Sequence, residues 1–301
     1  MAKLTVEYPN GNTEELMHVY GMTYNTKLRN LFPNGDIKAQ IENVRDLEIR
    51  DDDIYLATYP KCGTHWVWEI LVMLVKGTAE YETKKKVAAF LDFRAPETIN
   101  KLLSPRVLNC HYPFKLIPRQ MLQKGTKIVH VMRNPKDAFV SFYHHMQSMN
   151  KGALAKSFEE FLPLMLGDYG FYMFYPWFKY VKEWERFSKQ HPEQIINLYY
   201  EDIKEDPVRE IKKINEFLGT GRDEVLIQKI AESCDFRNLK KADAEIKVHE
   251  HMLHSSDMPV IYRKGDVGDW KNHFTVAQND HMNEWLEENL LDTNLKFRYS
   301  L

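Results

Sequence analysis

A short apolar run followed at once by a tight turn and a long apolar helical stretch restricts the fold of this 301-residue chain more than any other segment. Residues 54–59 lie between the acidic triplet 51–53 and Pro60, and their length and apolar content are typical of a buried strand. Residues 64–75 are apolar nearly all round and end at Gly77, which predicts a helix buried on most faces. A buried strand, turn and helix in succession indicate helices packed on a sheet.

The same order recurs further along the chain. Residues 127–132 and 194–200 have the length and β-branched content of buried strands, which suit the interior of a parallel sheet. Pro135 is predicted at the first position of a helix, and Ser157 with Glu160 forms a capping box that opens another. We therefore predict an α/β fold, with a central parallel sheet flanked by helices on both faces.

No internal repeat, low-complexity segment or Gly/Ser linker divides the chain, so residues 1–301 are predicted to form a single domain. No element is assigned within an N-terminal segment, residues 1–40. Residues 240–264 contain three histidines, Pro259 and few large aliphatic side chains, which predicts a long polar loop. Loops of that length in compact domains are usually lids or disordered segments.

Charge and composition exclude several classes of partner. The chain has 41 Lys plus Arg against 43 Asp plus Glu, a net charge of −2, so no bulk attraction to nucleic acid or an anionic membrane is expected. It has no signal-peptide pattern and no run of about 18 uncharged apolar residues. Three cysteines are too few for a disulfide framework and lack metal-ligand spacing. We expect a cytoplasmic, soluble protein without a bound metal.

The turn after the first strand carries the features of an anion site. Residues 59–66 read Tyr-Pro-Lys-Cys-Gly-Thr-His-Trp, which places Lys61 and Gly63 directly before the predicted helix. Free backbone N–H groups and the positive end of a helix dipole bind phosphate or sulfate, and Lys61 adds a full charge. The Walker pattern is absent, because Lys61 precedes the glycine. Taken alone, this turn is equally consistent with an ordinary lysine before a helix.

Four segments together resemble the cytosolic sulfotransferases. Residues 59–66 are similar to the 5′-phosphosulfate loop of that family, usually Tyr-Pro-Lys-Ser-Gly-Thr-Thr-Trp. Arg133-Asn134-Pro135-Lys136-Asp137, with Ser141 following, resembles the segment that holds the 3′-phosphate of the cofactor. Residues 200–207 are similar to the Tyr-Glu-Asp-Met-Lys run, and residues 263–272 to the Arg-Lys-Gly-x-x-Gly-Asp-Trp-Lys-Asn motif. The four segments occur in the order of the family, and the resemblance covers the chain from about residue 40 to its end.

The resemblance implies a donor, 3′-phosphoadenosine 5′-phosphosulfate (PAPS), a product, 3′-phosphoadenosine 5′-phosphate (PAP), and no metal. Arg133 follows a strand end and Ser141 lies two helical turns into the next helix, so both can reach one anion at the carboxyl edge of a parallel sheet. Trp66 and Phe236 match the residues that pack on adenine. The full set of donor-binding residues implied is Lys61, Cys62, Gly63, Thr64, His65, Trp66, Arg133, Ser141, Tyr200, Cys234, Phe236, Arg263, Lys264 and Gly265.

The resemblance also supplies the catalytic residues. Residues 104–113 are similar to the segment Ser-Pro-Arg-x-x-Lys-Thr-His-x-Pro, whose histidine is the general base, here His111. In-line sulfuryl transfer to a hydroxyl requires a base for the leaving proton and a positive charge where the bridging oxygen becomes anionic, and Lys61 fits the second role. Aromatic segments, namely Phe90 with Phe93, residues 143–149 and residues 169–177, are candidates for an apolar pocket and predict a small hydrophobic acceptor with a hydroxyl or amine, phenolic or steroid-like. The predicted acceptor-binding residues are Phe90, Phe93, Asn109, His111, Tyr143, Phe171 and Tyr175.

Several positions depart from the family pattern. Asn109 replaces the usual lysine two residues before the histidine, and Cys62 and His65 replace a serine and a threonine of the loop. Asp235 places a carboxylate in the segment associated with adenine. These changes leave open a nucleotide-binding homologue with weakened catalysis, and a nucleotide-dependent phosphotransferase is a further alternative.

Two C-terminal segments carry other expectations. Lys271, Thr275, Val276 and Asp280 are similar to the dimer motif Lys-x-x-x-Thr-Val-x-x-x-Glu of the family, which implies a homodimer. Residues 248–254 contain three histidines with spacing like that of metal ligands, but no carboxylate or cysteine converges on them, so a solvated loop is predicted.

Overall fold

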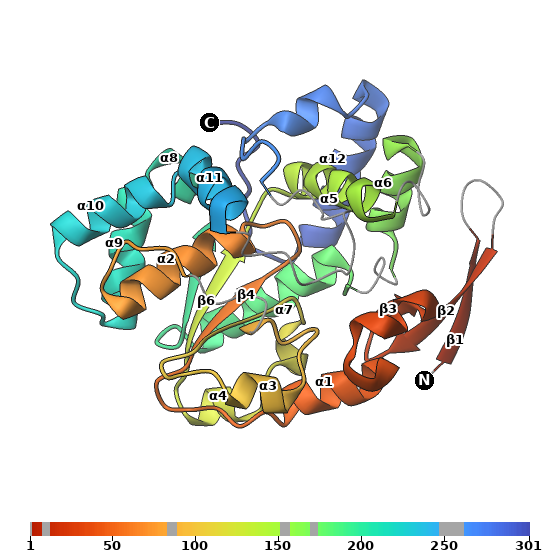
Figure 1. Cartoon of the computed structure of the whole chain (residues 1–301). Helices are drawn as coiled ribbons and strands as arrows, with labels where there is room; N and C mark the ends of the chain where they lie inside the picture. Colours follow the sequence, from red (N-terminus) through yellow and green to blue (C-terminus); the bar gives the residue numbers. More distant parts are fainter. Residues whose placement is uncertain (1, 8–12, 83–88, 151–156, 169–173, 247–261) are drawn as a thin grey trace.

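A four-stranded parallel sheet forms the centre of the molecule (Figure 1). The computed structural model describes residues 2–7, 13–82, 89–150, 157–168, 174–246 and 262–301. The strands are β4 (Ile54–Thr58), β5 (Val107–Cys110), β6 (Lys127–Met132) and β7 (Ile195–Tyr199), in the order β5-β4-β6-β7. All three neighbouring pairs are parallel, so the predicted α/β class is confirmed.

The strand order creates a switch point at the carboxyl edge of the sheet. The chain leaves β4 and returns in β5 on one side, then crosses to β6 on the other side of β4. Ligands of open α/β sheets bind at the edge where connections diverge in this way. The loops that follow β4, β5 and β6 are therefore the ones placed to build a site.

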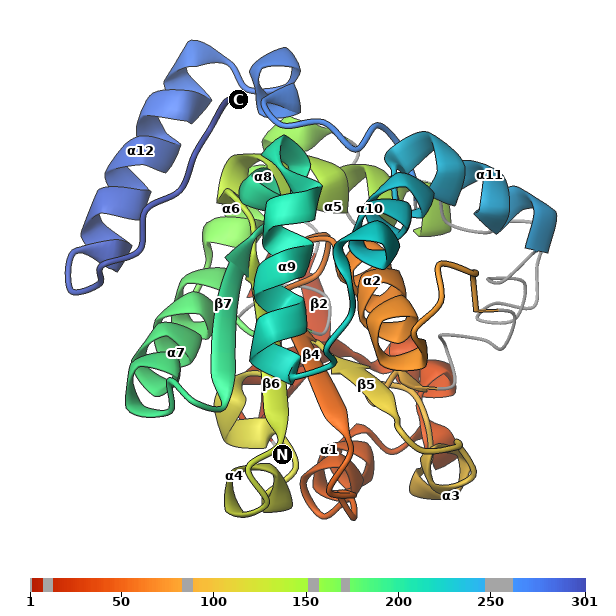
Figure 2. The ribbon, with the colours of Figure 1, turned by 90° about the vertical axis from the view of Figure 1, so that its left-hand side faces the viewer.

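Helices cover both faces of the sheet because the strands are apolar on both sides. Ile54 and Leu56 of β4 pack with α2 (Thr64–Lys76), α9 (Pro207–Leu218) and α10 (Glu224–Ser233), which lie over one face (Figure 2). Tyr55 and Ala57 belong to the core on the other face, with α1 (Ile37–Arg45), α5 (Pro135–Asn150), α7 (Trp177–Gln190) and α12 (Val276–Leu290). Alternate side chains of β4 thus point to opposite faces of the sheet and pack in two separate cores.

The N-terminal segment adds a small sheet that the sequence pattern did not indicate. Strands β1 (Ala2–Glu7), β2 (Thr13–Val19) and β3 (Met22–Asn25) pair antiparallel in that order, apart from the central sheet (Figure 1). Met22 and Tyr24 are fully buried, and Tyr24 meets Phe32 edge to face at a centroid distance of 5.9 Å. This sheet is therefore packed on the domain.

The remaining elements are short or lie near the edges of the sheet: α3 (Pro96–Asn100), α4 (Gln120–Gln123), α6 (Phe158–Leu166), α8 (Tyr200–Glu205), α11 (Phe236–Ile246), and the 3-10 helices η1 (Thr26–Leu31), η2 (Pro33–Gly35), η4 (Phe114–Leu116) and η5 (Asp269–Asn272). None of the helices in the described ranges is long and apolar enough to cross a membrane.

Helix ends follow the sequence signals closely, with one exception. Gly77 ends α2 in the left-handed region at φ 70°, and the Ser157 hydroxyl accepts the N–H of Glu160 at 3.2 Å at the start of α6. The prediction of a loop over residues 240–264 is wrong at its start, since residues 240–246 are the last turns of α11. Leu239 and Ala242, three residues apart, are buried and give this stretch an apolar helix face. Residues 247–261, which include the histidine tract, lie outside the described residues.

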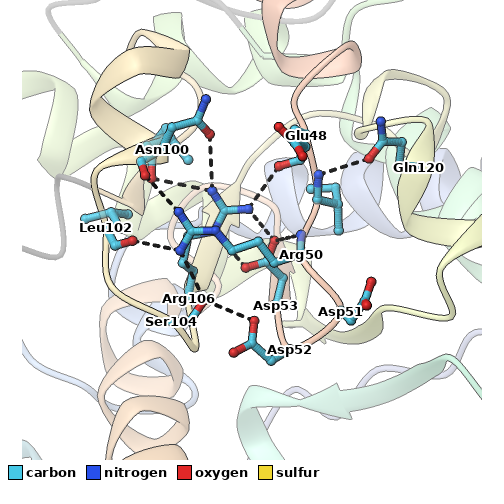
Figure 3. Close-up of polar contacts among 12 residues, drawn as sticks. Glu48, Arg50, Asp51, Asp52, Asp53, Asn100, Leu102, Ser104, Arg106 and Gln120 are labelled. Atoms are coloured by element: carbon cyan, nitrogen blue, oxygen red, sulfur yellow. Dashed lines mark hydrogen bonds and ion pairs between the residues drawn. The ribbon is translucent and has the colours of Figure 1, made fainter.

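A buried ion pair joins the amino ends of β4 and β5 at the opposite edge of the sheet (Figure 3). The Arg106 guanidinium donates to both carboxylate oxygens of Asp53, at 2.7 and 2.5 Å, and both side chains are inaccessible to solvent. Arg106 also donates to the Glu48 carbonyl at 3.0 Å, and Arg50 donates to the carbonyls of Asn100 and Leu102 at 2.7 and 2.8 Å. These contacts fix the start of both strands.

Candidate active site

The loop between β4 and α2 has the backbone of an anion-binding turn. Lys61 and Gly63 both lie in the left-handed region, at φ 68° and 97°, and Gly63 caps α2. A Cβ at Gly63 would stand 3.0 Å from the Tyr200 ring, so both the conformation and the space require glycine. The Cys62 N–H donates to the Tyr59 carbonyl at 3.2 Å and closes the turn. The predicted strand, loop and helix are thus present as one unit.

Positive charge concentrates at this turn. The N–H groups of the first turn of α2, residues 64–66, have no carbonyl partner within the helix and point toward its positive end. Burial, together with the charges of Arg133 and Arg263, lowers the pKa of Lys61 to about 8. The protonated form of this lysine is unfavourable beside two arginines, and a bound anion with several negative charges would stabilise it. The donor set therefore fits a phosphate or phosphosulfate group.

Arg133 connects this loop to the C-terminal motif. It follows β6 directly, and its Nη1 donates to the Lys61 carbonyl at 3.0 Å while its Nη2 donates to the Asp266 carbonyl at 2.9 Å. Its guanidinium also lies over the Tyr200 ring, 4.1 Å from the centroid. The four segments that carry the predicted donor residues therefore meet at the carboxyl edge of the sheet.

The C-terminal motif is held by carboxylates. Asp269 pairs with Arg263 at 2.5 Å and with Lys264 at 2.6 Å, so these two cations lie side by side. Asp137 of α5 accepts the N–H groups of Gly268 and Trp270, at 2.7 and 2.8 Å. These bonds anchor the motif to the helix that begins two residues after Arg133.

Gly265 and Phe236 are in direct contact. Gly265 has φ 72°, and a Cβ there would stand 2.2 Å from the Phe236 ring. Phe236 also meets Tyr262 at a centroid distance of 6.1 Å, and Tyr262 meets His65 at 6.5 Å. The aromatic predicted from the adenine segment is thus brought beside the loop residue predicted for the phosphosulfate.

Other predicted donor residues differ in how much of the side chain is available. Trp66 meets Tyr200 edge to face at 5.2 Å, and its buried Nε1 has no partner among the described residues. Ser141 lies on α5 and is partly exposed. The Cys234 thiol points into the core, 3.8 Å from the sulfur of Met73. Its side chain therefore packs behind the site.

His111 stands where the ends of β4 and β5 meet. Its Nδ1 lies 2.8 Å from the Thr58 carbonyl, which can only accept, so Nδ1 carries the proton and the lone pair of the neutral ring is on Nε2. Thr58 also bonds Thr64 of α2 through the two hydroxyls, at 2.6 Å. His111, β4 and the anion loop are therefore joined by a short series of hydrogen bonds.

The backbone of His111 is held by a buried carboxylate. Both oxygens of Asp92 accept the His111 N–H, at 3.1 and 3.3 Å. Asp92 is fully buried, and burial raises its pKa to about 7. Asp92 therefore acts on the position of the imidazole through the main chain.

Aromatic rings surround the imidazole of His111. Phe90 and Phe174 meet it edge to face, at centroid distances of 5.1 and 5.5 Å, and Phe93 meets Phe90 at 5.0 Å. The predicted residues Phe90 and Phe93 thus lie in this ring cluster. Phe174 joins it from the segment in which the sequence suggested Tyr175.

Two predicted acceptor residues face elsewhere, and a third is not described. The Tyr175 hydroxyl accepts from Lys115 at 2.7 Å and its ring abuts Gly21 of the N-terminal sheet, because neighbouring residues in this segment point in different directions. Tyr143 packs on Phe158 and Phe161 near α6, at 5.6 and 5.5 Å. The expectation that these two side chains lie beside His111 is corrected accordingly. Phe171 lies outside the described residues.

Asn109 has a structural contact of its own. It is fully buried, and its amide donates to the Ala89 carbonyl at 3.0 Å. The N–H of Leu91 donates to the Asn109 carbonyl at 2.9 Å. The asparagine therefore holds the segment that carries Phe90 against β5.

Sequence reasoning missed two residues that position His111, Thr58 and Asp92, and placed Phe174 and His145 only within longer candidate segments. Thr58 and Asp92 act through hydrogen bonds to His111, and no motif marks them. His145 follows Ser141 by four residues on α5, the spacing that places both on one helix face. That spacing is a signal that could have singled it out within the candidate segment 143–149. Within the described ranges, no three His, Cys, Asp or Glu side chains gather as a metal ion requires.

Comparison with known protein families gives one match. The model described as the sulfotransferase domain matches residues 51–294. Among curated proteins, bovine sulfotransferase 1E1 is 33% identical over 271 residues, covering 86% of this chain and 90% of its own length. Mouse sulfotransferase 1 family member D1 is 36% identical over 268 residues, covering 85% and 89%.

Solved structures show the same similarity. The crystal structure of mouse sulfotransferase SULT7A1 complexed with PAP has a TM-score of 0.72 and 26% identity, with 93% of this chain and 96% of that chain covered. A retinol dehydratase in complex with androsterone and PAP has a TM-score of 0.73 and 21% identity, with 98% and 92% covered, and shares the fold.

Proposed function

This chain belongs to the cytosolic sulfotransferase family, and on that premise we propose that it transfers a sulfuryl group from PAPS to the hydroxyl or amine of a small hydrophobic acceptor, with His111 as general base. The observation that carries the proposal is the joining of His111 to the anion loop through Thr58 and Thr64. A base and a phosphosulfate site held this rigidly to each other suit transfer within one ternary complex.

The donor residues divide into two anion sites, as a nucleotide with a 3′-phosphate and a 5′-phosphosulfate requires. Lys61 and the N-terminus of α2 suit the phosphosulfate. Arg133, Ser141, Arg263, Lys264 and Gly265 suit the 3′-phosphate. Trp66 and Phe236 would hold the adenine. When bound, the donor supplies a sulfuryl group that leaves from a phosphate oxygen.

The residues of the chain then act on protons and charge. His111 accepts the proton of the acceptor at Nε2, because its Nδ1 donates a hydrogen bond to the Thr58 carbonyl. Lys61 and the N-terminus of α2 stabilise the negative charge that develops on the departing phosphate oxygen. The aromatic rings of Phe90 and Phe174 surround the base, which favours an apolar acceptor, phenolic or steroid-like.

The departures from the family pattern are compatible with activity. Burial raises the pKa of Cys62 to about 12, so its thiol is neutral at physiological pH and adds no negative charge to the anion loop. The Asp235 carboxylate accepts the Arg237 N–H at 2.9 Å and lies 3.6 Å from its guanidinium, so its charge is already engaged. These contacts favour an active enzyme over a weakened nucleotide-binding homologue.

We further propose that the protein is a cytoplasmic homodimer. Its three cysteines are free and buried, as suits a reducing compartment. The segment with Lys271, Thr275, Val276 and Asp280 is exposed, and Val276 is 79% exposed at the start of α12. Association with a second copy of the chain would remove this apolar side chain from water, which stabilises a dimer.

Replacement of His111 by alanine tests the mechanism. We expect turnover of a phenolic acceptor to fall at least about 100-fold, because the acceptor proton loses its base. The rise in melting temperature caused by PAP should stay as in the wild type, because the anion sites are intact. Turnover is measured with PAPS and a panel of phenols and alcohols, and binding by thermal unfolding with PAP.

His191→Phe provides the matched control. His191 ends α7 and stacks on Phe187 at a centroid distance of 6.4 Å, a contact that phenylalanine keeps. Both readouts should remain as in the wild type. Full turnover in His111→Ala would contradict the assignment of the base. Wild-type protein that binds PAP but sulfates nothing would point to the weakened homologue, and stabilisation by ATP with magnesium alone would point to a phosphotransferase.

A further inference from the structure

His145 is a half-buried histidine near the proposed base, and the proposed mechanism assigns it no role. It lies on α5, three residues after Phe142 and therefore on the same side of the helix. Phe142 meets Phe174 at a centroid distance of 5.6 Å, and Phe174 meets His111 at 5.5 Å. This side of α5 thus faces the aromatic surroundings of the reacting centre.

The imidazole of His145 has an unsatisfied buried atom. Its Nδ1 is inaccessible to solvent and has no hydrogen-bond partner in the described part of the chain. His130 also has a buried nitrogen without a partner, Nε2, but its Nδ1 bonds the Asn197 amide oxygen at 2.8 Å and its ring stacks on Trp184 at 4.8 Å, away from the reacting centre. Burying an unpaired polar atom destabilises a fold, so one that is retained beside a site calls for a ligand partner.

The surroundings keep this imidazole neutral. Burial lowers the pKa of His145 well below its usual range, and the charge of Lys61, together with that of His111 whenever its ring is protonated, acts in the same direction. A neutral imidazole presents one N–H donor and one lone pair. It is therefore suited to an uncharged hydroxyl or carbonyl group.

A second general base is the less fitting role. A histidine base needs a partner that fixes its tautomer and orientation, as the Thr58 carbonyl does for His111. Nδ1 of His145 has no such partner among the described residues. Recognition of a ligand group requires no fixed tautomer, because the ligand itself selects it.

Building on the proposed function, we infer that His145 is a specificity-determining residue that hydrogen-bonds a second polar group of the acceptor through Nδ1. The preferred acceptors are then apolar skeletons with two uncharged polar groups, one that reacts at His111 and one that meets His145. A monohydroxy acceptor of the same shape leaves Nδ1 unpaired. Sites built to bond a ligand hydroxyl discriminate strongly against analogues that lack it.

The test compares matched acceptors on the full-length protein. We would measure kcat/KM with PAPS for 2-naphthol and the dihydroxynaphthalene isomers, and for androstane skeletons with one or two polar groups. In the wild type, at least one bifunctional acceptor should exceed its monohydroxy analogue about tenfold or more. His145→Phe should reduce that ratio to near the statistical factor of about two that applies to a symmetric diol, while retaining turnover of the monohydroxy acceptor.

Two further variants separate recognition from packing. His145→Asn places an amide near the position of Nδ1 and should keep most of the wild-type ratio, although it fills less space than phenylalanine. His191→Phe removes an imidazole elsewhere and should leave the ratio unchanged. Thermal unfolding with PAP confirms that each variant is folded and retains the donor site.

The two hypotheses fail in different ways. Wild-type turnover without preference for any bifunctional acceptor, or the same preference in His145→Phe, overturns this inference and leaves the proposed function standing. Absence of any sulfated product from the wild type overturns the proposed function and this inference with it.

Discussion

Lys61 combines an unusual backbone with an unusual charge state. A left-handed φ at a non-glycine residue costs about 1–2 kcal/mol, and residues held in this way cluster at functional sites. The same residue stands at the anion loop, where burial and two arginines make its protonated form costly. Both costs are offset when an anion binds the charged form. Strain and charge at one residue thus prepare the loop for its ligand.

The lowered pKa of Lys61 predicts how PAP affinity depends on pH. With a pKa of about 8, Lys61 is charged below that value and neutral above it, whereas the bound anion favours the charged form. The dissociation constant of PAP should therefore rise above about pH 8, by up to about tenfold per pH unit. Titration calorimetry between pH 7 and 9.5 measures this rise.

Lys61→Met supplies the comparison. PAP should bind this variant more weakly at pH 7, and its affinity should change little between pH 7 and 9.5, because the titrating group is gone. An equally steep rise in both proteins would show that another group controls the pH dependence.

At the scale of single residues, motifs located the charged and glycine positions but not the direction of side chains. Lys61, Gly63, His111, Arg133 and Arg263 were predicted as site residues because they match motifs with fixed spacing. Within the candidate run 169–177 Tyr175 was singled out, whereas its neighbour Phe174 meets the His111 ring, because which of two adjacent aromatics faces His111 depends on the path of an irregular segment. His145 lies in the candidate acceptor segment 143–149 but was not singled out, because one histidine on a helix gives no signal without its neighbours.

Among the secondary-structure elements, the Arg106–Asp53 pair fixes the strands that carry the base. It ties the amino ends of β4 and β5, whose register pairs Ala57 with Cys110 at the other end. Thr58 and His111 follow these two residues directly. An ion pair at one edge of the sheet therefore supports the geometry of the site at the opposite edge.

Arg106→Leu should destabilise the fold by about 3–5 kcal/mol, because Asp53 is left as an uncompensated buried charge. Urea unfolding monitored by circular dichroism measures the loss. Replacing both residues with leucine should recover much of it, since the buried charge is then removed as well.

Arg119→Leu is the control for this prediction. Arg119 pairs with Asp46, but both side chains are more than half exposed, at 58% and 59%, so its loss should cost at most about 1 kcal/mol. Equal losses in Arg106→Leu and Arg119→Leu would refute a special role for the buried pair.

Strong periodicity made the central elements predictable, and its absence hid others. Strands β4, β6 and β7 and helices α2, α5 and α6 were predicted because buried runs and helix-end residues are local signals, whereas β5 and the other helices that cover the sheet were not predicted. The small N-terminal sheet was missed because β2, with Glu14 and Glu15 in succession, lacks the alternation that marks a half-buried strand. Its place in the fold depends on Met22 and Tyr24 reaching a core built by distant residues.

At the scale of the whole molecule, the proposed donor and acceptor sites share the carboxyl edge of one sheet, and the proposed dimer surface lies on α12. Val276 follows Thr275, whose hydroxyl accepts the Gln278 N–H and whose N–H donates to the Gln278 side chain. This capping box fixes the start of the helix without using Val276. Val276 therefore contributes neither to the helix cap nor to the core, so its replacement tests association without disturbing the fold.

Val276→Glu should convert the proposed dimer into a folded monomer. A carboxylate at an apolar contact is costly to bury, whereas the same side chain on an isolated protomer remains in water. Sedimentation velocity over a range of concentrations reports the mass, and thermal unfolding with PAP reports whether the donor site persists.

Val225→Glu, at a valine that is 64% exposed on α10, controls for the added charge and should sediment as the wild type does. A wild-type protein that is monomeric at every concentration would refute the dimer, and a dimer that survives Val276→Glu would move the interface elsewhere. Because the helix cap and the core are untouched, a loss of association with PAP binding retained would place the dimer contact outside the machinery of the site.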